Sequence, residues 1–225
     1  MSTLYIGDIH EKADRLKELI GLHGPKASRV VLLGDYFDSW DGYGLHTEQT
    51  VNWLVENINK PNYHFLWGNH DLQYGCQLDN RVFQCSGYNK KTRELCKKRL
   101  TWDGFWSKLH FNVVFDDFSC THAGWTEKSI STDFSGAKLS VQTGVFHGLF
   151  AVGKARGGNS TNPGPLWTDW EREFKPLKGM NQIVGHSEVK VIEIRTGDDS
   201  LNFNIDTGLR EVLLIHGPGE WEILG

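Results

Sequence analysis

The sequence has no apolar run long enough to cross a bilayer as a helix. Its start, MSTLYIGDIH, lacks the basic flank and long apolar region of a signal peptide, so we expect a cytoplasmic protein. It has only four cysteines, and their spacing does not match a zinc knuckle, so we expect reduced thiols. A basic excess is also missing. The net charge of −4 argues against a chain built mainly to bind nucleic acid, although bound cations would make a phosphate site more positive.

The composition is that of a folded chain. Hydrophobic residues make up 39% of the 225 positions, which is enough to build a core. No internal repeat and no low-complexity tract divides the sequence. We therefore predict a single domain over residues 1–225, with a candidate helical insert at 72–110.

Short apolar runs alternate with helical stripes in the first third of the chain. Strands are predicted at Thr3–Ile6, Arg29–Leu33 and Tyr63–Trp67, separated by helices over 11–22 and 51–58. This order predicts a parallel α/β sheet. From about residue 112 no long helix separates the last strands, which predicts a mixed or antiparallel sheet. The later strands are expected at Phe111–Phe115, Phe118–Thr121, Gln182–Val184, Val189–Arg195, Asn202–Ile205 and Glu211–His216.

Two stretches interrupt this order. Residues 72–110 contain a basic cluster between Lys90 and Arg99, which is either part of an insert beside the site or a solvated helix face. Residues 153–165, GKARGGNSTNPGP, are predicted to be a loop.

The most informative pattern is the way the strands end. Each of five apolar runs is followed by residues that carry chemistry: Asp8 and His10; Asp35 and Asp38; Asn69, His70 and Asp71; His122; His186. The carboxyl ends of strands in open α/β sheets are where sites form, and the neighbouring glycines allow sharp turns there. A lone Gly-Asp or Gly-His is weak evidence, but the ordered set predicts side chains that converge.

These residue types favour a metal site. Carboxylate oxygen and imidazole nitrogen suit Mn²⁺, Fe and Zn²⁺ better than Ca²⁺, and the lack of a cysteine metal motif disfavours a structural zinc site. Such ligands can hold two divalent ions about 3.5–4 Å apart, one carboxylate bridging them. We expect Mn²⁺, with Fe and Zn²⁺ as alternatives. A metal-bridging hydroxide would then attack a phosphate ester, and a histidine would protonate the leaving group.

The motifs GDIH, GDYFD, GNHD, THAG and IVGHS, supported by PLWTDW and NIDTG, resemble those of the calcineurin-like metallophosphoesterase superfamily. The resemblance runs from Gly7 to about Gly208 and is nearest to the bacterial and phage branch of the phosphoprotein phosphatases, which includes lambda-type protein phosphatase and the symmetrical diadenosine tetraphosphatases. It implies an α/β (α+β) fold, a four-layer αββα sandwich of two mixed sheets flanked by helices.

The resemblance also implies roles for individual residues. Asp8, His10 and Asp35 would bind the first metal, with Asp35 bridging to the second. Asn69, His122 and His186 would complete the second metal. His70 would be the general acid, paired with Asp38. Asn69 has no acid–base use and suits ligation, whereas His70 beside it can carry a proton.

The chain departs from the family pattern at several points. Glu11 stands where the phosphatases usually have glycine, and Ser39-Trp40 replace the Arg-Gly whose arginine grips the substrate phosphate. Arg172, Arg156 or a lysine of the 90–99 cluster are candidates for that contact. His186 is followed by Ser187-Glu188 rather than a Thr-His pair, which argues against the phosphodiesterase branch. Trp40 and Trp125 are candidates for the substrate mouth, with core packing as the alternative.

Several functions stay open at this stage. The leading hypothesis is a phosphatase of phosphomonoesters, including phosphoserine or phosphothreonine proteins. The alternatives are a dinucleoside polyphosphate hydrolase, a nucleic-acid phosphatase or nuclease, and a catalytically silent binding module. The last is disfavoured because every expected ligand and the acid–base pair are present. We expect a phosphorylated substrate and no membrane partner, and the sequence leaves the oligomeric state open.

Overall fold

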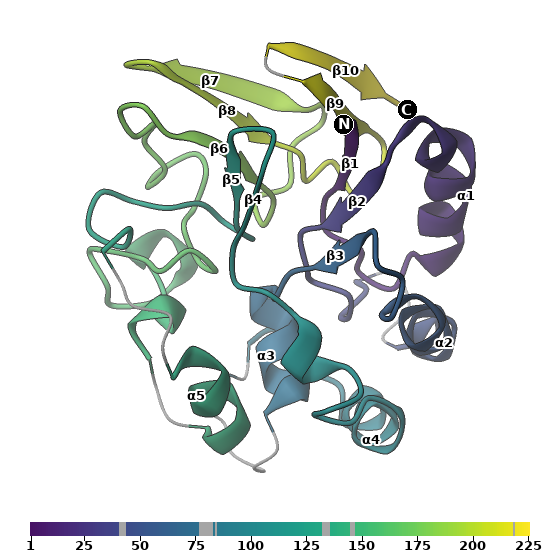
Figure 1. The fold of residues 1–225 in the computed structure, drawn as a ribbon. Coiled ribbons are helices and arrows are strands. Elements are labelled where there is room, and N and C mark those ends of the chain that lie inside the picture. The colour runs from purple at the N-terminus through teal and green to yellow at the C-terminus, as the bar shows by residue number, and fades with distance from the viewer. Residues whose placement is uncertain (41–43, 77–82, 84, 132–135, 145–146, 218) are drawn as a thin grey trace.

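The computed structural model describes residues 1–40, 44–76, 83, 85–131, 136–144, 147–217 and 219–225. Two five-stranded mixed sheets stack face to face, and helices flank them (Figure 1), as the fold class predicted. The strands are β1 Thr3–Ile6, β2 Arg29–Leu32, β3 Tyr63–Phe65, β4 Val113–Phe115, β5 Phe118–Cys120, β6 Asn181–Val184, β7 Glu193–Gly197, β8 Ser200–Asn204, β9 Val212–Gly217 and β10 Glu220–Leu224. The α-helices are α1 Ala13–His23, α2 Thr47–Asn57, α3 Asn69–Gly75, α4 Lys90–Arg99 and α5 Ala137–Thr143. Short 3-10 helices are η1 Gly24–Lys26, η2 Trp106–Lys108, η3 Gly148–Phe150 and η4 Lys154–Arg156.

The first sheet has the order β10-β9-β1-β2-β3. Strands β1, β2 and β3 are parallel, as predicted, while β9 runs antiparallel to β1 and β10 antiparallel to β9. The three parallel strands are joined through α1 and α2, which cover the outer face of this sheet (Figure 1). The parallel strands therefore all end at the same edge.

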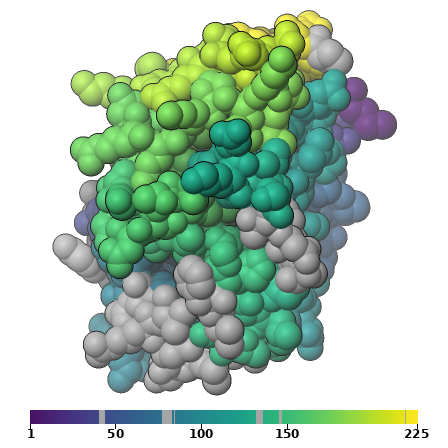
Figure 2. Space-filling model, turned by 90° about the vertical axis from the view of Figure 1, so that its left-hand side faces the viewer, coloured from purple at the N-terminus to yellow at the C-terminus, as the bar shows by residue number. Residues whose placement is uncertain are grey.

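The second sheet has the order β4-β5-β6-β8-β7. Its central strands β5, β6 and β8 are parallel, and the edge strands β4 and β7 pair antiparallel, so the predicted mixed sheet is confirmed. Figure 2 shows the side of the molecule covered by residues from the middle of the chain, coloured green, below the yellow-green strands β7 and β8. Trp170 and Phe174, whose rings stack with centroids 4.4 Å apart, pack with Val184 of β6 in a small separate core.

The main contact between the sheets is a buried apolar layer. Tyr5 and Val31 from the first sheet meet Phe118, Ile183 and Phe203 from the second. A larger cluster fills the space between the first sheet and its helices, with Leu16 and Leu54 as members. Burial on both faces explains why residues 4–6 of β1 and 30–32 of β2 form continuous apolar runs rather than alternating with polar residues.

Some element boundaries differ from the prediction. The run predicted as a strand over Val189–Arg195 pairs only from Glu193 onward. Val189 instead donates its backbone N–H to the Asp206 carbonyl, 2.8 Å away, and packs beside Trp170. Strand β10 was not predicted. Its short, largely exposed sequence EWEIL is held in the sheet by antiparallel pairing with β9. Residues 153–165 form a loop as expected, apart from the single turn η4.

Candidate active site

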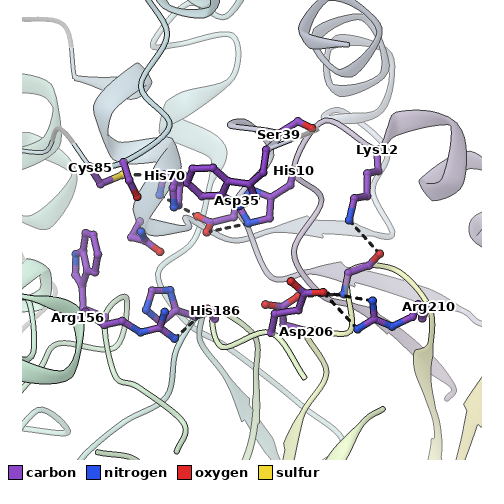
Figure 3. A pocket seen from close by; sticks show the side chains of 16 residues that line it. His10, Lys12, Asp35, Ser39, His70, Cys85, Arg156, His186, Asp206 and Arg210 are labelled. Atoms are coloured by element: carbon purple, nitrogen blue, oxygen red, sulfur yellow. Dashed lines mark hydrogen bonds and ion pairs between the residues drawn. The ribbon is translucent and has the colours of Figure 1, made fainter. Parts of the chain in front are cut away.

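Six parallel strand ends, three from each sheet, meet at one edge of the molecule. The polar residues that follow these strands are Asp8 and His10 after β1, Asp35 and Asp38 after β2, Asn69 and His70 after β3, His122 after β5, His186 after β6, and Asp206 after β8. Figure 3 shows His10, Asp35, His70, His186 and Asp206 around one cavity. The convergence predicted from the order of the motifs is therefore present.

Two glycines let the ends of β2 and β3 approach each other closely. Gly34 has a φ of +102°, and a Cβ placed on it would lie 2.3 Å from the backbone nitrogen of Gly68. A Cβ on Gly68 would lie 2.1 Å from Oδ1 of Asp35. Any larger residue at either position would push the two strand ends apart, so this spacing depends on glycine.

Asp71 fixes the loop that carries Asp35. Its carboxylate accepts hydrogen bonds from the backbone N–H groups of Asp35 and Tyr36, both at 2.9 Å, and of Gly68 at 2.8 Å. Asp35 itself has a φ of +49°, in the left-handed region that non-glycine residues seldom occupy. The buried carboxylate of Asp71 thus holds an unfavourable backbone conformation that aims Asp35 into the site.

The first cluster consists of Asp8, His10 and Asp35. Nε2 of His10 lies 3.9 Å from Asp8 and 3.8 Å from Asp35. Nδ1 of His10 lies 2.9 Å from the carbonyl oxygen of Phe37, which can only accept, so Nδ1 carries the proton. Nε2 is therefore free to offer its lone pair between the two carboxylates, the arrangement usual for a metal-binding histidine.

The second cluster consists of Asp35, His122 and His186. Nδ1 of His122 donates to the carbonyl of Leu33 at 2.8 Å, so its Nε2 also faces the cluster. This Nε2 lies 2.9 Å from Oδ1 of Asn69 and 3.3 Å from Oδ2 of Asp35. Without a proton on this Nε2 all three atoms are acceptors, so a positive charge, either that proton or a metal ion, is needed between them. Asp35 belongs to both clusters.

The pKa shifts in the site reflect the strong coupling between its buried carboxylates and histidines. Burial, together with the nearby Asp206, raises the pKa of Asp8 well above its usual range. Burial also raises the pKa of Asp206. Burial acts in the same direction on Asp35, but His122 and His70 outweigh it and hold the pKa of that carboxyl well below its ordinary value. Burial alone would lower the pKa of His122, yet Asp35 and Asp8 raise it to about 9.

His186 provides the clearest test of whether these residues fit metal ions. Burial, with His122 and Arg156 nearby, holds its pKa well below the usual range, so the ring is neutral. Among the described residues, its Nε2 is a buried polar atom without a hydrogen-bond partner. Leaving a buried acceptor unpaired is costly, and ligation of a cation removes that cost. The donor set of carboxylates, imidazoles and one amide therefore fits borderline-hard divalent ions.

His70 and Asp38 form a pair beside the two clusters. Nδ1 of His70 lies 2.7 Å from Oδ2 of Asp38, which also accepts from Gln73, and Oδ1 of Asp38 accepts from Tyr74. Burial opposes protonation of His70, but Asp35 and Asp38 outweigh it and raise the pKa of His70 well above its usual value. The ring is thus held in its cationic, proton-donating form next to the clusters.

The clusters open into a cavity of about 640 Å³. His70 and Cys85 line it on one side, and Lys12 and Arg210 lie at the opposite end (Figure 3). Two indole rings border it as well. Trp40 is 53% exposed and its ring centroid lies 5.8 Å from that of His70, while the ring of Trp167 lies 5.7 Å from that of His186. The cavity lining is therefore mainly polar and charged, with the two indole rings as its large apolar surfaces.

A family model described as calcineurin-like phosphoesterase matches residues 1–190. The chain belongs to this family. It is therefore a hydrolase of the metallophosphoesterase family, as the motifs predicted. No curated protein matches the sequence. The part of the chain that the structure describes contains no helix long and apolar enough to cross a membrane.

Several solved structures share the fold at low sequence identity. A cold-active protein-tyrosine phosphatase of a psychrophilic Shewanella species aligns with a TM-score of 0.67 and 14% identity, covering 100% of this chain and 80% of that one. A protein serine/threonine phosphatase from Saccharomyces cerevisiae aligns with a TM-score of 0.54 and 12% identity, covering 100% and 79%. A putative diadenosine tetraphosphatase aligns with a TM-score of 0.53 and 13% identity, covering 99% and 92%.

All eight predicted site residues lie in or beside the two clusters. The candidates for contact with the substrate phosphate differ in whether they reach the cavity. Arg156 lines the cavity, whereas Arg172 is exposed and is not among the described residues that line it. The 90–99 cluster does not reach the cavity either. Arg93 of that cluster is buried and donates to the backbone carbonyls of Gln73 and Cys76 at the end of α3, so its role is to cap a helix.

Sequence reasoning missed Asp206 as a site residue. It stands in the motif NIDTG, which carried a signal only as a supporting resemblance, and its carboxylate lies in the cavity wall beside Asp8. Trp40 lines the cavity as suggested, but Trp125 is buried and its Nε1 donates to Ser119 at 3.1 Å. Core packing is therefore the correct alternative for Trp125.

Proposed function

We propose that this chain is a two-metal phosphomonoesterase with His70 as its proton donor. The observation that carries the proposal is the arrangement of two ligand clusters that share Asp35, with the His70–Asp38 pair beside them. A shared carboxylate keeps two cations close together, as hydrolysis of a phosphate ester requires. The nearby cationic histidine matches the need of a leaving alkoxide for a proton.

Asp8, His10 and Asp35 would hold one ion, and Asp35, Asn69, His122 and His186 the other. Two bound divalent cations would supply an activated water, clamp the phosphate oxygens and offset negative charge. We propose Mn²⁺ as the preferred metal, because the ligand set mixes carboxylates with imidazoles and contains no thiolate. Asp206, beside Asp8, adds negative charge that favours cation binding.

His70 acts on the leaving group. Asp38 fixes the orientation of its ring through Nδ1, which leaves Nε2 to deliver a proton toward the cavity. Asp38 also stabilises the charged ring, and it keeps two further hydrogen bonds, from Gln73 and Tyr74, that hold its own position. The pair thus supplies both a proton and a fixed direction for its transfer.

Arg156 is the proposed substitute for the phosphate-gripping arginine that is missing at Ser39. Its Nε lies 2.9 Å from Asp169, and one terminal nitrogen lies 2.6 Å from Oγ of Ser187. These contacts hold the guanidinium at the cavity wall next to His186. A planar cation fixed in this way can bind phosphate oxygens with little loss of side-chain entropy.

A second candidate is hydrolysis of dinucleoside polyphosphates. Lys12 and Arg210 border the far end of the cavity, away from Arg156, where they could contact a second phosphate, and Trp40 offers a surface for a base. One similar structure is that of a putative diadenosine tetraphosphatase. The nuclease alternative loses support, because the basic residues of the 90–99 cluster do not line the cavity.

The test is hydrolysis of p-nitrophenyl phosphate by metal-stripped protein, with and without added Mn²⁺, alongside bound metal counted by elemental analysis. We expect Mn²⁺-dependent turnover in the natural chain and its loss, with fewer bound ions, in Asp35→Asn. Diadenosine tetraphosphate is assayed in parallel. No turnover of the aryl phosphate by fully metal-loaded protein would refute the phosphomonoesterase proposal, and efficient cleavage of the dinucleotide would then favour the second candidate.

A further inference from the structure

Cys85 lies against the proposed acid–base pair. Its Sγ is 3.5 Å from Nδ1 of His70, and that nitrogen is 2.7 Å from Oδ2 of Asp38. One ligand atom from each of Asp38, His70 and Cys85 lies within 4.8 Å of the other two. This thiol cluster shares no residue with the two clusters that contain Asp35. Neither general-acid catalysis nor metal binding at Asp35 requires a thiol at this position.

We propose that Asp38, His70 and Cys85 form a third metal site, which binds a thiophilic divalent ion such as Zn²⁺ and thereby switches the enzyme off. The inhibitory effect rests on the proposed role of His70 as proton donor, while the binding itself does not. The chemistry separates this site from the other two. A thiolate, an imidazole and a carboxylate form a zinc ligand set, whereas Mn²⁺ prefers sites without sulfur.

The distances are close to those that zinc needs. With Zn–S about 2.3 Å and Zn–N or Zn–O about 2.0–2.1 Å, tetrahedral geometry places sulfur and nitrogen about 3.5 Å apart and nitrogen and oxygen about 3.3 Å apart. The Sγ–Nδ1 distance of 3.5 Å already agrees. The Nδ1–Oδ2 distance of 2.7 Å must widen by about 0.6 Å on this geometry, as expected when an ion replaces a shared proton.

The surrounding residues hold the three ligands in place. Gln73 donates to Asp38 through Nε2 and accepts the backbone N–H of Cys85 through Oε1, at 3.1 Å, so one side chain connects two of the ligands. Tyr74 donates to the other oxygen of Asp38. Such partners of ligands orient them and strengthen metal binding. Because His70 and Cys85 line the cavity, an ion can enter from solvent and keep a water as its fourth ligand.

Occupation of this site would weaken the proton donor. Binding releases the thiol proton of Cys85 and the Nδ1 proton of His70 to solvent, and the metal takes the place of both. With the metal on Nδ1 the ring carries a single proton, on Nε2, and no longer has its direct hydrogen bond to Asp38, so donation of that proton would leave an imidazolate instead of a neutral ring. Zn²⁺ would therefore inhibit even when the two proposed catalytic sites are filled with Mn²⁺.

The experiment has two independent readouts, made on the natural chain, Cys85→Ser and the control Cys96→Ala, whose thiol is buried on α4 away from the cavity. The first is titration of the Mn²⁺-loaded protein with Cd²⁺ or Co²⁺, followed through the ultraviolet charge-transfer absorption of a thiolate–metal bond. The second is the Zn²⁺ concentration that halves hydrolysis of an alkyl phosphate, whose leaving group needs the proton of His70, taken relative to each variant's own activity without Zn²⁺.

We expect the charge-transfer band in the natural chain and in Cys96→Ala, and its absence in Cys85→Ser. We also expect Cys85→Ser to need at least about tenfold more Zn²⁺ for half inhibition, because a direct ligand is lost. A natural chain without the band, or equal Zn²⁺ sensitivity in Cys85→Ser, would overturn the proposal. If the Mn²⁺-loaded chain proves inactive, the proposed function fails, and the band alone decides whether the third site exists.

Discussion

The replacement of His70 by asparagine tests the acid–base assignment most directly. His70 belongs to neither cluster that contains Asp35, so the variant should bind the same number of Mn²⁺ ions as the natural chain. General acid catalysis typically contributes about 10²–10⁴ in rate, which corresponds to about 2.7–5.4 kcal/mol of transition-state stabilisation. We expect a loss of kcat in this range for an alkyl phosphate, whose leaving group needs a proton.

The loss should depend on the leaving group. The p-nitrophenolate ion leaves without protonation, so kcat for p-nitrophenyl phosphate should fall much less than kcat for an alkyl phosphate. The fold should survive, because Asp38 keeps its hydrogen bonds from Gln73 and Tyr74, and we expect a stability loss of about 1–3 kcal/mol. Steady-state kinetics with both substrates, metal analysis and thermal unfolding measure these quantities.

A suitable control is His216→Asn, which removes a histidine on β9 that pairs with Glu222 outside the cavity. Its kinetics should match those of the natural chain for both substrates. Equal losses of kcat for the alkyl and aryl phosphates in His70→Asn would refute proton donation by His70. A lower metal content in that variant would show instead that the histidine supports the metal ligands.

Three further substitutions test the site from other directions. Gly68→Ala would place a Cβ 2.1 Å from Asp35, so we expect the folded protein to lose about 1–3 kcal/mol of stability and to bind Mn²⁺ more weakly. The control Gly21→Ala has open space around its Cβ and should not destabilise the fold. Equal melting temperatures for the two variants would contradict this expectation. Arg156→Gln should lower kcat/KM by about 10–100-fold, because a charged hydrogen bond to the substrate phosphate is lost. The control Arg172→Gln should leave kcat/KM unchanged. Similar kinetics for the two variants would exclude Arg156 from substrate binding. Trp40→Ala should reduce the preference for aryl over alkyl phosphates by about 2–10-fold, and Trp40→Phe should retain most of it; an unchanged ratio would mean that the indole does not contact the substrate.

The sequence by itself was sufficient to predict the parallel strands of the first sheet and the polar residues at their carboxyl ends. The apolar runs before Gly7, Gly34 and Gly68 predicted β1, β2 and β3 and their parallel order, because buried strands in an α/β sheet are apolar throughout. The same runs placed polar residues at their carboxyl ends, where parallel strands bring them together. Residue type and order predicted a metal site there, and the resemblance to the metallophosphoesterases implied the division of the ligands between two ions and the pairing of His70 with Asp38.

The sequence could not decide features that depend on contacts between distant segments. Strand β10 depends on pairing with β9 rather than on its own apolar pattern. Arg156 and Arg172 are both arginines in polar surroundings, and only the path of the loop places Arg156 at the cavity and Arg172 in solvent. Trp125 follows a site motif as closely as Trp40 does, yet its indole packs inward.

Tertiary structure also decided the local chemistry of the site. The ring orientation that turns Nε2 of His122 toward Asp35 results from a hydrogen bond between its Nδ1 and the carbonyl of Leu33, which lies 89 residues earlier in the chain. The approach of Cys85 to His70 likewise joins two residues that lie 15 positions apart in the chain, a contact that residue order alone does not specify. Residue identity and strand order determine which chemical groups reach this edge of the sheets, because strand ends share an edge. Loop packing decides which of these groups contact one another, because a shift of one or two ångströms in the position of a donor atom is enough to prevent it from acting as a ligand.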